Sequence, residues 1–449
     1  MKGIIVSSNC SGSGKTTITL GLMKALMKLG YDVQGYKVGP DYIDPAFHTA
    51  ITNKDSRNLD LFLMGEDGVK ASYSRGTGDI AVIEGVMGLF DGKSIHSEFS
   101  TAHLAETLNL PIILVLSPKS SSLTFGAEIQ GILNYSDEYI KKPNIKGIIL
   151  NNISNSYYNL MKIIIEKNFR VKVYGHIPKD PELSLKSRHL GLIQCMEIED
   201  IEYKINKCSD YILSNIDMDN LIADFKESED YEDNFHIENK NLKIAIALDF
   251  GFSFYYKENI ELLEELGEVT YFSPLYDERL PENIDFLYMG GGYPEVFIEK
   301  LSKNTSMLKS IKEALDNGLH CYGECGALMY LSKSITDLDD NTFHTVGFLN
   351  GKSLMTKSLQ NFGYARIEIN KKNNLLDNLS INCHEFHKSK VKINEVCIFD
   401  VEKIMYDDKV KKWKCGYIKN NTLAAYPHIH FFGNMEFLKS LIKNIKLHK

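Results

Sequence analysis

The sequence predicts an α/β protein with two domains, each containing a sheet covered by helices. Short β-branched runs alternate with helical stretches, which is typical of a parallel sheet with helices on both faces. The alternation stops in one acidic stretch and restarts after it. The chain has 449 residues, 43% of them hydrophobic, which is enough for two or three domain cores.

The first domain is expected over residues 1–196. Its strands are predicted over 2–8, 31–39, 79–85, 110–116 and 145–152, with a helix over 16–30. Residues 197–241 are acidic and lack strand signals, so we expect a helical and acidic linker. The second domain is expected over 242–449. Its predicted elements are strands over 242–249, 268–274 and 284–292, helices over 258–267 and 309–318, a strand passing into a helix over 319–331, and a tail of short strands before a last helix.

Composition and charge exclude several classes of protein. The 51 Lys and Arg residues against 59 Asp and Glu give a net charge of -8, which argues against nucleic-acid binding. No apolar run approaches the roughly 20 residues of a membrane helix, and the N-terminus lacks the layout of a signal peptide. We therefore expect a cytoplasmic protein without a membrane partner, with reduced cysteines, and a homodimer is one expected assembly.

A phosphate-binding loop follows the first predicted strand. It consists of Ser11, Gly12, Ser13, Gly14, Lys15, Thr16 and Thr17. Glycines allow backbone N–H groups to face an anion, the lysine reaches the β- and γ-phosphates, and the first threonine can bind Mg²⁺. Asn9 stands where the strict pattern has glycine, and asparagine tolerates a left-handed conformation. The pattern predicts nucleotide binding, and the alternative is an ordinary glycine-rich turn.

Three acidic residues lie at the expected carboxyl ends of strands. Asp41 and Asp44 follow the second strand, and Glu84 ends the third. Ligands of open α/β sheets bind at these ends, and Mg²⁺ prefers oxygen ligands. We therefore expect Mg²⁺ ligands among these three carboxylates and Thr16, and we assign the metal site to Thr16, Asp44 and Glu84. The alternative for both aspartates is that they cap turns.

Cys325 is the candidate nucleophile of the second domain. It lies between a strand and a helix, which indicates a nucleophile elbow, and the helix N-terminus is expected to lower its pKa. Gly291 and Gly292 end another strand and could supply an oxyanion hole. His428 and His430 share one face of a strand-like run, so one could be the base and the other its orienting partner.

A second pair of histidines lies in His384-Glu385-Phe386-His387. This spacing differs from the H-E-x-x-H pattern of zinc hydrolases. We expect a loop that contacts substrate or an ordinary polar turn, and the sequence assigns no role to either histidine.

Together these motifs resemble the cobyrinate a,c-diamide synthase family. The first half is similar to dethiobiotin-synthetase-like ATPases, and the second to class I (triad) glutamine amidotransferases. The matching runs span nearly the whole chain: SGSGKTT, YKVGPDYIDPAFH, IEGVMGLFDG, SRHLGL, GGGYPE, YGECGALMYL, CHEFHKS and YPHIHF.

The resemblance implies a ligase of cobalamin biosynthesis that uses ATP and L-glutamine. Glutamine would be hydrolysed at Cys325 with His428 as base, and ATP would phosphorylate the c and then the a acetate of cobyrinate, a corrin, for attack by ammonia. Most triad amidotransferases carry Glu two residues after the histidine, where this chain has His430. The alternatives are a nickel sirohydrochlorin substrate, a regulatory protein without activity, and simple deamidation.

The resemblance also implies roles in the first domain. Asp41, Tyr42 and Ile43 would border the macrocycle, and Lys37 would contact the transferring phosphate. Asn151 and Pro178 would lie near adenine.

Overall fold

The computed structural model describes residues 1–119, 121–183, 201–369 and 373–445. The chain divides into two compact units. The first contains Met1–Leu61 and Gly65–Asp233, and the second contains Phe62–Met64 and Asn234–Lys449. The predicted run SRHLGL lies outside the described residues.

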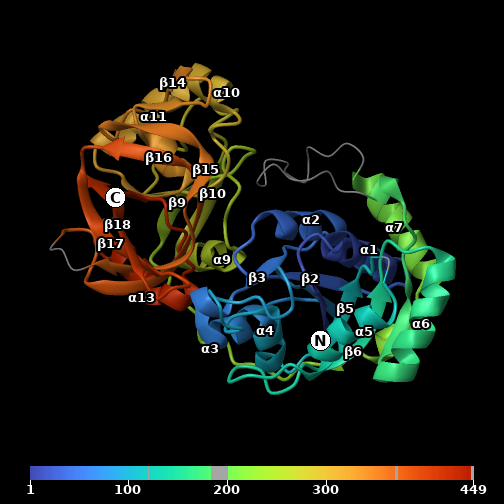
Figure 1. The fold of residues 1–449 in the computed structure, drawn as a ribbon. Coiled ribbons are helices and arrows are strands. Elements are labelled where there is room, and N and C mark those ends of the chain that lie inside the picture. The colour runs from blue at the N-terminus through green and yellow to red at the C-terminus, as the bar shows by residue number, and fades with distance from the viewer. Residues whose placement is uncertain (120, 184–200, 370–372, 446–449) are drawn as a thin grey trace. The chain divides into compact units, whose positions relative to one another are not determined.

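The first unit contains an eight-stranded sheet in the order β3-β2-β4-β1-β5-β6-β7, with β8 paired to β1. Strands β2, β3, β5 and β6 of this sheet are labelled in Figure 1. All pairs along this path are parallel, and only β8 is antiparallel within the described part of the unit. The strands are β1 (Lys2–Ser8), β2 (Val33–Val38), β3 (Arg57–Leu59), β4 (Ile80–Glu84), β5 (Ile112–Leu116), β6 (Ile145–Leu150), β7 (Lys172–His176) and β8 (Lys226–Glu227). The helices are α1 (Lys15–Lys28), α2 (Ile43–Thr52), α3 (Leu61–Ser74), α4 (Thr101–Thr107), α5 (Leu123–Asn134), α6 (Asn155–Phe169), α7 (Ile201–Asn215) and α8 (Met218–Ala223). The predicted parallel sheet is confirmed, and it brings the carboxyl ends of β1, β2 and β4 together.

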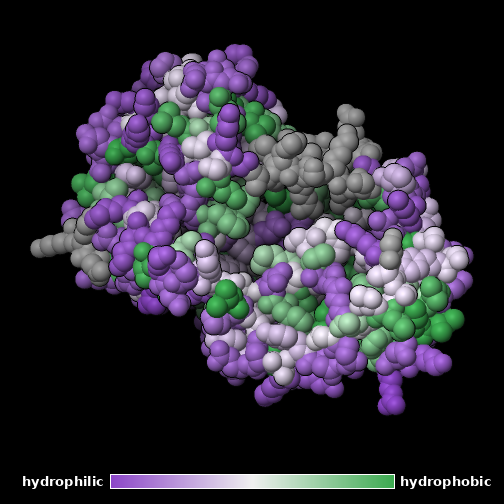
Figure 2. Space-filling view, in the orientation of Figure 1, coloured by the Kyte–Doolittle hydropathy of each residue, from purple (hydrophilic) through white to green (hydrophobic). Residues whose placement is uncertain are grey.

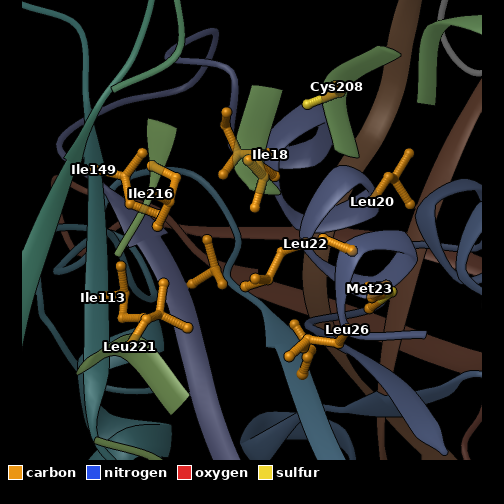
Figure 3. Close-up of a cluster of buried hydrophobic side chains, with 14 of the residues drawn as sticks. Ile18, Leu20, Leu22, Met23, Leu26, Ile113, Ile149, Cys208, Ile216 and Leu221 are labelled. Carbon is orange, nitrogen blue, oxygen red and sulfur yellow. The ribbon is translucent and has the colours of Figure 1, made fainter. Parts of the chain in front are cut away.

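The segment expected to be a linker is largely part of the first unit. Helix α7 packs against α1, and its apolar residues Ile205, Cys208 and Ile212 are buried in the core of this unit. Figure 3 labels Cys208 among the buried side chains of this core. These residues are three and four positions apart, so they line one face of the helix. The expectation of a linker over 197–241 is therefore wrong for residues 201–233. Its acidic composition reflects the exposed face of the helix and the stretch after it.

The second unit contains an eleven-stranded mixed sheet in the order β10-β9-β11-β12-β19-β18-β17-β15-β13-β14, with β16 paired to β15. The strands are β9 (Leu242–Ala247), β10 (Gly267–Phe272), β11 (Phe286–Met289), β12 (His320–Glu324), β13 (Ser334–Thr336), β14 (Thr342–His344), β15 (Gly351–Ile369), β16 (Leu379–Ile393), β17 (Val396–Ile404), β18 (Val410–Lys419) and β19 (Thr422–Ala425). The helices are α9 (Lys257–Leu266), α10 (Ile298–Lys303), α11 (Thr305–Asp316), α12 (Gly326–Leu331) and α13 (Met435–Ile442). Strands β10, β9, β11, β12 and β19 are parallel neighbours, so the carboxyl ends of β11, β12 and β19 meet at one edge.

The tail of the second unit is built from long antiparallel strands, where the sequence suggested short ones. Strand β15 has 19 residues and β16 has 15. Their register shifts between Met355 and Gln360 and again between Gln360 and Gly363. These irregularities interrupt the two-residue alternation by which a long strand is recognised.

Hydrophilic side chains cover much of the visible face, with small groups of apolar side chains among them (Figure 2). No helix in the described part of the chain is long and apolar enough to cross a membrane.

Candidate active sites

The phosphate loop lies between β1 and α1, and two of its glycines have left-handed conformations. The φ angles of Gly12 and Gly14 are 78° and 92°, a region that residues with a Cβ atom rarely adopt. A Cβ atom on Gly14 would also collide with Nδ2 of Asn151. Helix α1 begins at the next residue, and the first turn of a helix leaves backbone N–H groups available to an anion. The geometry is that of a phosphate-binding loop.

Asn151, directly after β6, supports this loop. Its Nδ2 donates a hydrogen bond of 2.9 Å to the carbonyl oxygen of Ser13, and Oγ of Ser117 donates one of 3.1 Å to the same oxygen. The contact that the structure gives Asn151 is thus with the loop that holds phosphate. Recognition of adenine by Asn151 and Pro178 stays a prediction.

Lys15 is held by backbone carbonyl groups. Its Nζ donates to the carbonyl oxygen of Met87 at 2.6 Å and to that of Cys10 at 3.4 Å. Burial lowers the pKa of Lys15, and the nearby Lys37 lowers it further. An incoming phosphate would replace these carbonyl oxygens and supply the negative charge that they lack.

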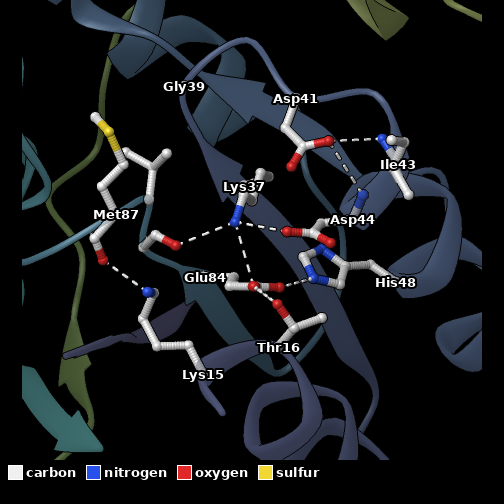
Figure 4. A network of polar contacts seen from close by, with 12 residues as sticks. Lys15, Thr16, Lys37, Gly39, Asp41, Ile43, Asp44, His48, Glu84 and Met87 are labelled. Atoms are coloured by element: carbon white, nitrogen blue, oxygen red, sulfur yellow. Dashed lines mark hydrogen bonds and ion pairs between the residues drawn. The ribbon is translucent and has the colours of Figure 1, made fainter. Parts of the chain in front are cut away.

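Glu84 is the centre of a buried polar cluster at the end of β4 (Figure 4). It is fully buried. Its Oε1 accepts a hydrogen bond of 2.5 Å from Oγ1 of Thr16, and its Oε2 lies 2.8 Å from Nε2 of His48. The cluster therefore joins the first turn of α1 and helix α2 to the end of β4.

Lys37 forms ion pairs with two carboxylates of this cluster. Its Nζ lies 2.8 Å from Oδ2 of Asp44 and 3.2 Å from Oε1 of Glu84, and it donates to the carbonyl oxygen of Gly85 at 3.1 Å. Burial alone would lower the pKa of Lys37, but Asp44 and Glu84 outweigh it and raise the pKa above its ordinary value. Lys37 is therefore charged, and the contacts shown are with the protein. Its predicted contact with the transferring phosphate stays a prediction.

His48 also belongs to this cluster, although it is not among the site residues predicted from the sequence. It is fully buried. Besides its contact with Glu84, its Nδ1 lies 3.1 Å from Oγ of Ser56, which in turn donates to the carbonyl oxygen of Gly35. A signal was present, because His48 follows Asp44 by four residues and therefore lies on the same face of α2.

Asp41 and Asp44, in the loop before α2 and at the start of this helix, make different contacts. Oδ1 of Asp41 accepts hydrogen bonds from the backbone N–H groups of Ile43, at 2.8 Å, and Asp44, at 3.4 Å. Asp41 therefore caps the turn that leads into α2, whereas Asp44 pairs with Lys37, and a contact of Asp41 with a macrocycle stays a prediction. Tyr42 and Ile43 are half-buried at the start of α2, and their contact with a macrocycle stays a prediction.

The cluster fits a magnesium ion that ATP phosphates help to bind. The described residues contain no group of three His, Cys, Asp or Glu side chains able to hold a metal alone. Mg²⁺ in phosphate sites usually takes one or two carboxylates and completes its shell with phosphate oxygens and water. Thr16, Asp44 and Glu84 offer oxygen donors of this kind beside the phosphate loop.

In the second unit, Cys325 lies at the junction of β12 and α12. Its φ and ψ angles are 48° and -97°, which are rare for a residue with a side chain. Its backbone N–H donates to the carbonyl oxygen of Ala425 at 2.7 Å, which fixes the turn against β19. A strained strand-to-helix turn of this kind is typical of a nucleophile elbow.

The expected lowering of the thiol pKa is wrong. Cys325 is only 5% exposed, and burial raises its pKa well above the ordinary value. The carboxylates of Glu295, Glu385 and Glu324 raise it further, and the N–H group of Gly326 opposes them only in part. Helix α12 has only six residues. The thiol is therefore protonated before the substrate binds, and its activation needs a base.

His428 lies shortly after β19, which ends at Ala425, in a confined position. It is 2% exposed, and its Nδ1 lies 3.3 Å from Oε2 of Glu324. Its backbone exchanges two hydrogen bonds with His384, of 2.8 and 3.2 Å. A Cβ atom added to Gly291 would lie 2.6 Å from Cε1 of the His428 ring. Ring and backbone are thus fixed from several sides.

His430 faces a different carboxylate from His428. Its Nε2 lies 3.3 Å from Oε2 of Glu258, and its Nδ1 accepts a hydrogen bond from the backbone N–H of Phe432. The two-residue alternation fails here because β19 ends at Ala425. The contacts shown therefore place Glu324 beside Nδ1 of His428, where the sequence analysis expected His430.

Gly291 and Gly292 lie beside the elbow. The carbonyl oxygen of Gly291 accepts hydrogen bonds of 3.1 Å from the backbone N–H groups of Ser253 and Phe254. A Cβ atom on Gly326, the residue after the nucleophile, would lie 3.3 Å from the backbone nitrogen of Gly292. The predicted oxyanion hole is therefore consistent with this geometry and stays a prediction.

The second histidine pair lies on strand β16, not in a loop. His387 stacks on Tyr426 with ring centroids 3.6 Å apart, and its Nε2 lies 3.0 Å from Oε2 of Glu385. Oε1 of Glu385 accepts a hydrogen bond from Nε1 of Trp413. Burial, with the charges of His428 and Lys403, lowers the pKa of His384 to about 3, so His384 is neutral.

Comparison with known proteins matches both halves of the chain. Residues 4–193 match the CobQ/CobB/MinD/ParA nucleotide binding domain, and residues 243–436 match the CobB/CobQ-like glutamine amidotransferase domain. Two relatives named cobyrinate a,c-diamide synthase match at high identity. The protein of Clostridium tetani is 64% identical over 99% of this chain and 100% of its own. That of Clostridium acetobutylicum is 58% identical over the same shares.

The chain belongs to the cobyrinate a,c-diamide synthase family. A more distant member, from Caldanaerobacter subterraneus, is 42% identical over 98% of this chain and 97% of its own. As a member of this family, the protein is a glutamine-hydrolysing, ATP-dependent ligase. The predicted family, fold class and type of enzyme are confirmed.

Proposed function

We propose that the protein converts cobyrinate to cobyrinate a,c-diamide in cobalamin biosynthesis, by amidating the c and then the a acetate side chain. One observation carries this proposal. A single chain holds a phosphate loop with a buried carboxylate cluster and, on a separate unit, a thiol elbow with a buried histidine. The names of the full-length relatives support the choice of substrate.

The thiol site would supply ammonia from L-glutamine. His428 takes the proton of the Cys325 thiol while Sγ attacks the δ-carbonyl carbon of glutamine. The C–N bond breaks, and the imidazolium returns its proton to the leaving ammonia. Water then cleaves the thioester and releases glutamate. A buried, protonated thiol favours this concerted activation over attack by a preformed thiolate.

The phosphate site would activate the acetate carboxylate. A carboxylate oxygen attacks the γ-phosphorus of ATP, ADP leaves, and an acyl phosphate forms. Ammonia attacks the acyl carbon, phosphate leaves, and the amide nitrogen loses a proton. Activation is necessary because a free carboxylate does not react with ammonia.

The lysines of this site would offset the repulsion between the substrate carboxylate and the phosphates of ATP. Two anions about 4 Å apart repel by about 4 kcal/mol at an effective dielectric constant of 20. Lys15 would offset this repulsion at the phosphates, and Lys37 holds the charges of Asp44 and Glu84. Mg²⁺ bound by Thr16, Asp44 and Glu84 would supply further positive charge to the phosphate oxygens.

The test is incubation of the protein with ATP, Mg²⁺, L-glutamine and either cobyrinate or nickel sirohydrochlorin, with mass spectrometry of the products. Each amidation replaces OH by NH₂, which lowers the mass by about 1 Da. We expect two successive losses with cobyrinate and dependence on both ATP and glutamine. If only nickel sirohydrochlorin is amidated, that compound is the substrate instead of cobyrinate. If neither compound is amidated in the presence of ATP, the proposed function is refuted.

A further inference from the structure

We propose that Glu324, the residue directly before the nucleophile, is the positioning residue that orients the ring of His428. This inference rests on the proposed glutaminase reaction. In most triad amidotransferases this carboxylate lies two residues after the histidine, and that position holds His430 in this chain. The structure supplies a carboxylate from another strand, β12, at the required ring nitrogen.

Geometry supports this role at both carboxylate oxygens. Oε2 of Glu324 lies 3.3 Å from Nδ1 of His428, and Oε1 lies 3.5 Å from the backbone nitrogen of Ile429. Glu324 is 1% exposed, so the contact is shielded from water. An acceptor at Nδ1 fixes the tautomer with hydrogen on Nδ1, so Nε2 is the ring nitrogen that can take a proton.

The position of Nε2 agrees with this tautomer. The added Cβ atom of Gly291 would lie 2.6 Å from Cε1 and 3.4 Å from Nε2 of His428. The ring edge that carries Nε2 therefore faces the glycine turn beside the elbow, while the Nδ1 edge faces Glu324. When Nε2 takes the thiol proton, the carboxylate stabilises the positive charge on the ring.

The competing role for Glu324 predicts the opposite effect. Its charge is one of the causes that raise the pKa of Cys325. If this were its whole contribution, removal of the charge would favour the thiolate and increase reactivity. A positioning role predicts a loss of reactivity instead, so the direction of the change separates the two.

The experiment measures glutamine hydrolysis and ammonia-dependent amidation in Glu324→Gln. Gln keeps the side-chain size but removes the charge. We expect kcat for glutamine to fall at least about 100-fold, as when a carboxylate that orients a catalytic histidine is removed. The KM for glutamine should stay within a factor of three, and amidation with ammonium chloride at alkaline pH should be unchanged. Glu324→Asp keeps the negative charge but holds it farther from His428, so its kcat for glutamine should lie between those of the unaltered protein and Glu324→Gln.

Two further variants complete the test. Glu265→Gln alters another carboxylate next to a histidine, His236, outside the site, and should match the unaltered protein. Glu258→Gln tests the competing pair with His430: a loss there equal to that of Glu324→Gln would overturn the proposal.

Wild-type kcat in Glu324→Gln, or an increase, would also overturn the proposal, as would parallel loss of ammonia-dependent amidation. If Glu324→Gln does not fold, Glu324→Asp decides by the same criteria. Failure of the unaltered protein to hydrolyse glutamine would refute the proposed function itself, which is a distinguishable result.

Discussion

Gly291→Ala should damage glutamine hydrolysis by displacing one ring. The new Cβ atom would lie 2.6 Å from Cε1 of His428 and 3.3 Å from Cβ of Phe254. Carbon atoms pack best at about 3.5–4.0 Å, so the ring must shift by about 1 Å. A displacement of that size costs on the order of 100-fold in rate, which corresponds to about 2.7 kcal/mol in the activation free energy. The φ angle of Gly291 is not in the left-handed region, so alanine introduces no backbone strain of that kind.

The assay compares kcat for glutamine hydrolysis with ATP-dependent amidation from ammonium chloride. We expect the first to fall about 100-fold and the second to stay within a factor of two. Gly131→Ala is the matched control, because its added methyl group meets no atom within 4 Å. Unaltered glutamine hydrolysis in folded Gly291→Ala would refute the inferred position of His428. Equal loss with both nitrogen sources would show instead that the substitution disturbs more than this ring.

Three further predictions test the charges of the two sites. Lys15→Ala should abolish amidation with either nitrogen source, while basal glutamine hydrolysis, measured as glutamate release, remains. Loss of both activities in folded protein would contradict the assignment of the two reactions to separate sites. Asp44→Asn should lower kcat for amidation at least about 10-fold and change the Kd for ATP by less than about 3-fold. The substitution removes one of the two carboxylates that pair with Lys37, while the asparagine side chain can still accept a hydrogen bond from it. A large rise in the Kd for ATP, measured by calorimetry, with kcat unchanged would refute this prediction. The third concerns His384, whose pKa of about 3 lies below its value of about 6.5 in the unfolded chain. The unfolded state therefore binds the extra proton, and stability should fall by on the order of 1–3 kcal/mol as the pH drops from 6.5 to 4. His384→Phe should flatten this dependence in urea titrations, and an unchanged slope would count against it.

The phosphate loop could be predicted because its signals are local. An apolar run, glycines with left-handed angles and a helix start lie within one short segment, so sequence order alone places Gly14 and Lys15. Glu84 could be placed at the same edge because parallel strands bring their carboxyl ends together. These inferences needed only the order of elements and the general geometry of parallel sheets.

The partner of His428 could not be predicted in this way. Glu324 reaches it because β12 and β19 pair in parallel with Glu324 opposite Ala425, and because β19 ends there. Register between strands about 100 residues apart leaves no local mark in the sequence. The same holds for the thiol pKa, since the burial and the carboxylates that raise it come from several elements.

The two sites handle charge in opposite ways, and this follows from their chemistry. In the first unit, Lys37 lies between two carboxylates at 2.8 and 3.2 Å, so charged groups are gathered where anions must approach each other. In the second unit, burial keeps Cys325 protonated and His384 neutral. A cationic cluster beside the thiol would favour a standing thiolate, which is open to oxidation and needs no base. Because the thiol is neutral, its activation depends on His428. The surrounding residues must therefore hold the His428 ring in the position where it can accept the thiol proton.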